Sequence, residues 1–163
     1  MSMLGAEKDA PTEFARSKAE ADAFLATCDL DWFILRPGLV LAPSAYGGTA
    51  MLRAIATCPL VTPITNADSR IQVIDVDDVV RTVSMALKPG ATARAIWQLA
   101  HPHVHRLEDI ILAIRAWLGE PARPVWHVPR GIGHIIARCA DTLSWLGWRS
   151  PARTTAIRQL NAG

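Results

Sequence analysis

The chain has 163 residues, of which 50% are apolar and 20% charged, so it is expected to fold as one globular domain and not to be disordered. Its 17 basic and 15 acidic residues are interspersed and give a net charge of +2, which excludes an electrostatic argument for a nucleic-acid partner. Three widely spaced cysteines (Cys28, Cys58 and Cys139), a charged start and no membrane-length apolar run indicate a cytoplasmic protein with reduced thiols.

The first predicted element is a helix that Thr12 caps and that ends near Cys28. Its composition is rich in Ala, Lys and Glu, which favours a helix. One face of this helix is predicted to carry a stripe made of Phe14, Ser17, Lys18, Ala21 and Leu25.

The next segments alternate between strands and helices. Residues 32–35 are short and apolar throughout, which is typical of a strand buried on both faces of a parallel sheet. A short helix is predicted at 50–58, an irregular segment at 59–70 and a strand at 71–76. A helix then begins with acidic residues in its first turn and ends at Pro89–Gly90.

The last part of the chain begins with a second short buried strand at 95–100, followed by a loop at 101–105. The strongest helix pattern follows, with an apolar face of Leu107, Ile110, Ile111, Ile114 and Leu118 and a stop at Gly119. Residues 123–148 are predicted to form a short extended piece followed by another amphipathic helix.

This alternation predicts an α/β fold with a mainly parallel sheet and flanking helices. Only about three strands are recognisable, and neither G-x-G-x-x-G nor G-x-x-G-x-x-G occurs in the chain.

The segment "TEFARSKAEADAFL" places Phe14 and Lys18 four residues apart, on one face of the predicted helix. Taken alone, the pair is explained by a core aromatic residue and a solvated lysine. Two further segments change this interpretation, because they occur in a characteristic order after it. These segments are "LDWFILRPGLVLAP" and "IQVIDVDDVV".

With "SMLGAEKDAPTEFARSKAEADAFL", these blocks resemble the C-terminal half of extended or atypical short-chain dehydrogenases/reductases, a group that includes NAD-dependent epimerases, dehydratases and NmrA-like proteins. The resemblance covers residues 1 to about 120 and implies a partial Rossmann-like fold. It implies that residues 1–100 are the C-terminal part of a Rossmann-like NAD(P)-binding domain and that residues 101–163 form a helical region, or lid, on the substrate side. It also implies a chain that starts inside the fifth strand of that fold, which we interpret as a shortened protein.

The resemblance assigns catalytic positions to Lys18 and Ser2, and it places Phe14 where the family has a tyrosine. In the family, the lysine favours the phenolate of the tyrosine and holds the nicotinamide ribose, while the phenol exchanges a proton as hydride moves to or from the cofactor. Phe14 has no ionisable proton, so this step cannot pass through it. Whether the protein is an enzyme therefore stays open.

The family's loop beside the nicotinamide corresponds to Arg36, Pro37 and Gly38, which we predict to be cofactor-binding together with Lys18. Asp77 and Asp78 match an acidic pair that organises the fold near the substrate pocket. The resemblance thus implies NAD or NADP in the complete fold. Without the glycine-rich turn, we expect neither dinucleotide to bind tightly to this chain.

Two functions follow from the resemblance. The first is the substrate-side portion of an NAD(P)-dependent oxidoreductase or epimerase-like protein, inactive as an isolated chain and acting on a small molecule. The second is a non-catalytic NAD(P) sensor or scaffold with the same fold. We expect either protein to form homo-oligomers, because the shortened fold leaves a sheet edge and apolar helix faces uncovered.

Several other features have ordinary explanations that we prefer. His101, His103 and His105 have a spacing compatible with zinc, but a loop explains them, and no metal is predicted. Tyr46, the only tyrosine, could supply a phenol but fits a surface loop better. The acids Asp75, Asp77 and Asp78 fit a helix start better than a metal site. Peripheral membrane contact by the tryptophan-rich end (Trp126, Trp145 and Trp148) is less favoured than a packed helix over the substrate side.

Overall fold

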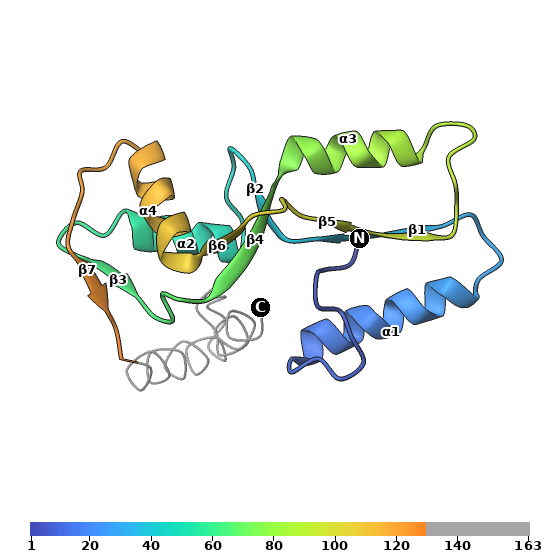
Figure 1. Ribbon diagram of the computed structural model, residues 1–163, viewed down its shortest axis with the longest axis horizontal. Helices are drawn as coiled ribbons and strands as arrows, with labels where there is room; N and C mark the ends of the chain where they lie inside the picture. Colours follow the sequence, from blue (N-terminus) through green and yellow to red (C-terminus); the bar gives the residue numbers. More distant parts are fainter. Residues whose placement is uncertain (130–163) are drawn as a thin grey trace, which may run out of the picture. The chain divides into compact units, whose positions relative to one another are not determined.

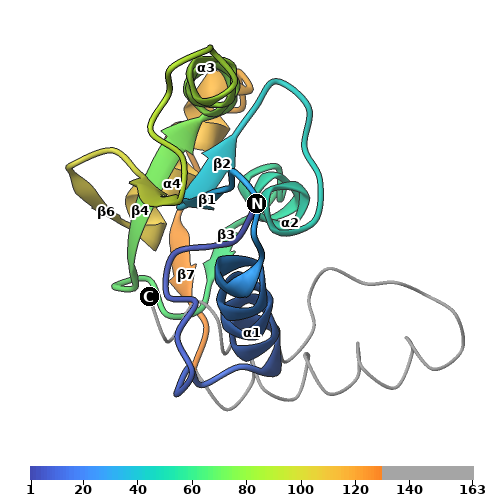
Figure 2. The ribbon, with the colours of Figure 1, turned by 90° about the vertical axis from the view of Figure 1, so that its right-hand side faces the viewer.

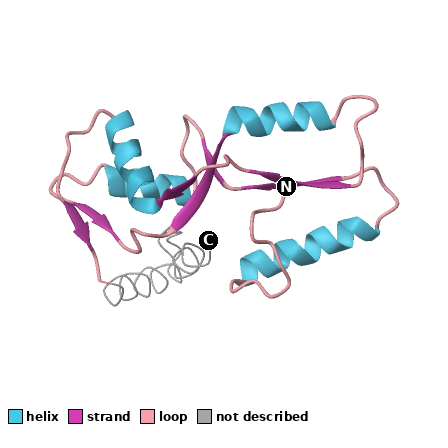
Figure 3. Cartoon of the chain, viewed as in Figure 1, coloured by secondary structure: helices cyan, strands magenta, loops and turns pink. Residues whose placement is uncertain are grey.

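A computed structural model describes residues 1–129, and Figures 1 and 3 show its elements in chain order. The four helices in this part of the chain are α1 (Glu13–Thr27), α2 (Gly48–Ala56), α3 (Val76–Ala86) and α4 (Leu107–Trp117). The strands there are β1 (Phe33–Pro37), β2 (Leu39–Leu41), β3 (Thr62–Ile64), β4 (Arg70–Asp75), β5 (Ala95–Leu99), β6 (Val104–Arg106) and β7 (Val125–His127). The amphipathic helix predicted in the later part of residues 123–148, with Cys139, Trp145 and Trp148, lies outside the described residues.

The chain forms two compact units. Of the described residues, the first unit contains 1–43 and 72–104, and the second contains 44–71 and 105–129. The predicted boundary at residue 100 concerns cofactor-side and substrate-side roles, which the compactness of these units does not test. It therefore stays a prediction.

The first unit is built on a parallel pair of strands. β1 pairs with β5 from Phe33 opposite Ala95 to Pro37 opposite Leu99. Ser2 extends the hydrogen bonding of β1, because its amide donates to the Leu35 carbonyl at 2.8 Å. Figures 1 and 2 show α1 and α3 on opposite sides of this pair. The prediction of a parallel sheet covered by helices is confirmed.

A second parallel pair, β2 with β4, places Leu39 opposite Val73, and β6 adjoins β4 in the strand order β2-β4-β6. The predicted strand at 71–76 is therefore confirmed as β4. β2 was not predicted separately, because the apolar run is bounded by Pro37. The chain instead continues past this proline into three further strand residues.

Helix α1 begins where the sequence predicts, because Thr12 is 3% exposed and its Oγ1 accepts a hydrogen bond from the Ala15 amide at 3.2 Å. The predicted stripe does not form the buried face of this helix. The residues of α1 that are buried are Ala15 and Ala19, whereas Phe14 is 51% exposed. Alanine lets a helix approach its neighbours closely, and this close packing outweighs the larger side chains of the predicted stripe.

The second unit contains α2, α4 and a third parallel pair, β3 with β7, in which Thr62 lies opposite Val125. Its buried apolar side chains include Leu52, Ala56, Ile64, Ile110 and Ile111. The predicted apolar face of α4 is thus confirmed over its first turns. Gly119 ends this helix with φ +74°, a conformation that glycine adopts without strain.

Three predictions about the extended segments were incomplete or wrong. The segment predicted to be irregular contains β3, and the predicted histidine loop contains β6, in which His105 lies. Both strands are only three residues long, too short for a periodic pattern to show in the sequence. β5 was predicted to be buried, but its side chains alternate and Ile96 is 49% exposed. Within residues 1–129, no helix combines the length and the apolar character needed to cross a membrane.

Candidate functional site

Helix α1 carries Phe14, Lys18 and Asp22 at successive intervals of four residues, so the three side chains follow one face. The Nζ of Lys18 lies 5.7 Å from the centroid of the Phe14 ring, within the range of a cation–π contact. Phe14 is half exposed and is not a core residue. The structure therefore brings together the two positions that the sequence singled out, with an aromatic face beside the ammonium group.

Asp22 joins two of the other predicted site residues. Its Oδ2 accepts a hydrogen bond from the Ser2 hydroxyl at 2.8 Å. The same oxygen lies 3.0 Å from Nε and 2.9 Å from Nη2 of Arg36. The side chains of Arg36 and Asp22 are 20% and 12% exposed, so this ion pair is largely shielded from solvent. The segment around Ser2, helix α1 and strand β1 meet at one carboxylate.

Sequence reasoning missed Asp22, although one signal pointed to it. Asp22 follows Lys18 by four residues and Phe14 by eight, and it is therefore on the same helix face. Extending the predicted pair by one further helical turn would have included it. A carboxylate can only accept hydrogen bonds, so Ser2 Oγ is the donor in its contact with Asp22.

Gly38 has a structural reason to be glycine. A Cβ built at this position would lie 2.4 Å from the carbonyl oxygen of Gln72 and 3.3 Å from Cδ1 of Leu4. The Gly38 amide donates to the Leu99 carbonyl at 2.9 Å. The backbone after β1, two residues beyond Arg36, therefore passes between neighbouring segments where no side chain fits.

The acids at the start of α3 act as helix-terminal residues. Oδ1 of Asp75 accepts a hydrogen bond from the Asp77 amide at 2.8 Å, which caps the helix. Asp77 and Asp78 lie in the first turn, where the helix dipole favours negative charge. Asp78 also forms an exposed ion pair with Arg81 at 3.2 Å.

The histidine segment holds a ring contact. The rings of His101 and His103 stack with their centroids 5.0 Å apart, and the His103 amide donates to Nδ1 of His101 at 3.3 Å. His105 belongs to β6. Among residues 1–129, no three histidine, cysteine or acidic side chains are grouped closely enough to hold a metal ion.

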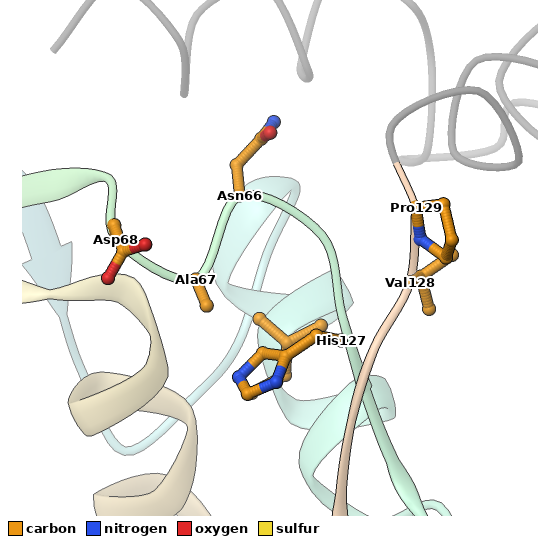
Figure 4. A pocket seen from close by; sticks show the side chains of 7 residues that line it. Asn66, Ala67, Asp68, His127, Val128 and Pro129 are labelled. Carbon is orange, nitrogen blue, oxygen red and sulfur yellow. The ribbon is translucent and has the colours of Figure 1, made fainter.

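A cavity of about 290 Å³ lies in the second unit (Figure 4). Its lining is made of Ile64, Asn66, Ala67, Asp68, His127, Val128 and Pro129. Beside it, Arg106 contacts Asp68 at 2.7 Å and Glu108 at 3.3 Å, and Glu108 contacts Nε2 of His127 at 3.2 Å. The hydrogen bond to Asp68 raises the pKa of Arg106. None of the residues predicted to be catalytic or cofactor-binding lines this cavity.

Tyr46, the alternative source of a phenol, is 94% exposed. Its amide and carbonyl both contact Oγ1 of Thr49, which lies in α2. These hydrogen bonds connect the backbone of Tyr46 to the first turn of α2.

The parallel strands with α1 and α3 around them define a Rossmann-like fold of the kind found in NAD-binding epimerases and dehydratases. No family model and no curated protein matches the sequence. Among solved structures, the chain is similar to UDP-glucose 4-epimerase of Thermotoga maritima with UDP-glucose, at TM-score 0.61 and 17% identity over 78% of this chain and 49% of that one.

Two further structures have the same fold. One is dTDP-glucose 4,6-dehydratase of Bacillus anthracis in complex with NAD, with a TM-score of 0.60 and 15% identity over 78% of this chain and 44% of that one. The other is RMD of Pseudomonas aeruginosa complexed with NADPH, with a TM-score of 0.57 and 17% identity over 75% and 46%. The chain therefore spans about half the length of these structures or less, and the likeness concerns the fold.

Proposed function

We propose that the chain is the substrate-side portion of an NAD(P)-dependent oxidoreductase or epimerase-like protein and that it does not turn over a substrate by itself. The contact between Phe14 and Lys18 on α1 carries this proposal. A phenylalanine ring occupies the position of the family's phenol beside the lysine, and it has no proton to exchange. The Rossmann-like fold around α1 supports the same assignment.

In this proposal, Lys18 holds the nicotinamide ribose, Ser2 faces a small-molecule substrate, and Arg36, Pro37 and Gly38 lie along the nicotinamide. Residues 1–100 supply the cofactor side, and residues 101–163 supply the substrate side. The protein is cytoplasmic and forms homo-oligomers. Large exposed apolar side chains support oligomer formation, among them Phe24 at 73% and Leu87 at 78% exposure.

A second candidate is a non-catalytic NAD(P) sensor or scaffold. The contact between Ser2 and Asp22 favours it, because Ser2 uses its one hydroxyl proton on a carboxylate. A serine held in this way cannot donate a hydrogen bond to a substrate oxygen at the same time. The retained Lys18 argues against a scaffold that has no cofactor at all.

We expect the chain to bind NADH and NADPH too weakly to saturate in the micromolar range. None of its 163 residues form the G-x-x-G-x-x-G turn that places backbone amides on the pyrophosphate. Isothermal titration calorimetry with each dinucleotide measures this directly, with a dehydrogenase of known affinity as the positive control. A micromolar dissociation constant would contradict the prediction.

The substitution Phe14→Tyr distinguishes the two functions in the protein expressed from its complete gene. If Lys18 and its surroundings form an intact pocket that lacks only an acid, the new phenol should create measurable oxidation of NADPH with aldehydes or quinones. Phe14→Leu is the matched control, because it changes the same ring without adding a proton. If the tyrosine variant is as inactive as the leucine variant, the sensor or scaffold is favoured.

A further inference from the structure

Lys18 has two neighbours at helical spacing on α1, Phe14 before it and Asp22 after it. The half-buried lysine is in contact with the ring of Phe14. A lysine followed by an acid four residues later can form an ion pair along the helix, although the reverse order is the more favourable one. Asp22 is therefore the residue of α1 best placed to form an ion pair with the Lys18 ammonium group.

Arg36 competes for the same carboxylate from a different element. It approaches Oδ2 of Asp22 from β1 with two nitrogens, at 3.0 and 2.9 Å, and the Ser2 hydroxyl donates to the same oxygen. The low exposure of both partners makes this pair stronger than an exposed contact along a helix. The negative charge of Asp22 is thus balanced by Arg36.

We infer that Arg36 is a positioning residue that acts through Asp22: by holding this carboxylate, it leaves the Lys18 ammonium available to a ligand oxygen. The ligand group has the chemistry of a hydroxyl, carbonyl or phosphate oxygen, each of which accepts hydrogen bonds from an ammonium group. The inference rests on the proposed function only in assuming that Lys18 faces a ligand. It gives Arg36 a role that requires no contact with the cofactor.

Competitive acetylation of the whole chain tests this arrangement without any cofactor. The sequence contains three lysines, and Lys8 and Lys88 are exposed, so they serve as internal references for Lys18. Limiting acetic anhydride is applied, and the labelling of each lysine is measured by mass spectrometry. In Arg36→Gln, Asp22 is released to pair with Lys18, and we expect the labelling of Lys18 relative to the references to fall roughly twofold.

The double variant Arg36→Gln with Asp22→Asn should restore the relative labelling of Lys18, because the released carboxylate is no longer present. A variant that merely loosens α1 would give the opposite sign, since a freer lysine is labelled faster. Unchanged or faster labelling of Lys18 in Arg36→Gln therefore overturns the inference, and so does a double variant that stays slow. Either failure leaves the dinucleotide titration and the Phe14→Tyr result unaffected, so the proposed function is tested separately.

Discussion

Replacing Arg115 with methionine is expected to lower the free energy of unfolding by about 3 kcal/mol or more. Arg115 is only 2% exposed, and its guanidinium group replaces water for three backbone carbonyls. Nε donates to Pro121 at 2.6 Å, while Nη1 donates to Ala56 at 2.5 Å and to Cys58 at 3.0 Å. Ala56 is the last residue of α2, so the positive charge also lies at the negative end of that helix dipole.

Methionine fills similar space but donates no hydrogen bond. The Ala56 carbonyl, whose contact with Arg115 is buried, and the part-buried carbonyls of Cys58 and Pro121 would lose their donor. Urea unfolding followed by circular dichroism measures the loss. Arg81→Met is the control, because Arg81 is 71% exposed in a surface ion pair on α3, and its replacement should change the unfolding free energy by less than about 0.5 kcal/mol. Equal stability of the two variants would contradict the role given to Arg115.

Introducing a single methyl group at Gly38 should cost about 1–3 kcal/mol of stability. The Cβ of Gly38→Ala would lie 2.4 Å from a carbonyl oxygen of β4, and this backbone atom cannot rotate away as a side chain could. The chain after β1 or strand β4 must therefore move. Since Arg36 lies two residues before Gly38, we also expect the ion pair with Asp22 to be disturbed.

Gly48→Ala is the matched control for this substitution, because nothing lies within 4 Å of a Cβ at Gly48 and the residue begins helix α2. There, alanine should leave stability unchanged or raise it by up to about 1 kcal/mol. Urea midpoints of both variants and the parent chain decide the comparison. If Gly38→Ala proves as stable as Gly48→Ala, Gly38 is not required for close packing.

The elements that the sequence predicted best are those whose signals are local. Three such signals are confirmed, and each depends on a few adjacent residues. They are the cap at Thr12, the acidic residues in the first turn of α3 and the helix stop at Gly119. β3 and β6 could not be predicted in this way. They are extended because of pairing with residues far along the chain, Val125 to His127 for β3, and a three-residue strand has no period of its own.

The candidate site likewise has one part that a local sequence pattern predicts and one part that it does not. The spacing of Phe14 and Lys18 on a helix is visible in the sequence, and the structure places their side chains in contact. Asp22 contacts Ser2 and Arg36, so this contact joins three segments that are separate in the sequence. No local sequence pattern indicates which basic side chain forms an ion pair with the Asp22 carboxylate. Whether the predicted catalytic and cofactor-binding roles apply to these residues stays a prediction.

The start of α4 has a consequence for how the second unit folds. Arg106 provides no side-chain cap, and the amides of Leu107 and Glu108 donate instead to the carbonyls of Ser69 and Ala67. The first turn of α4 therefore becomes stable only after a long loop of the chain has closed, which adds an entropic barrier that a locally capped helix avoids. Opening of the 66–69 turn would uncap α4, so the turn and the helix end are expected to gain and lose protection from hydrogen exchange together.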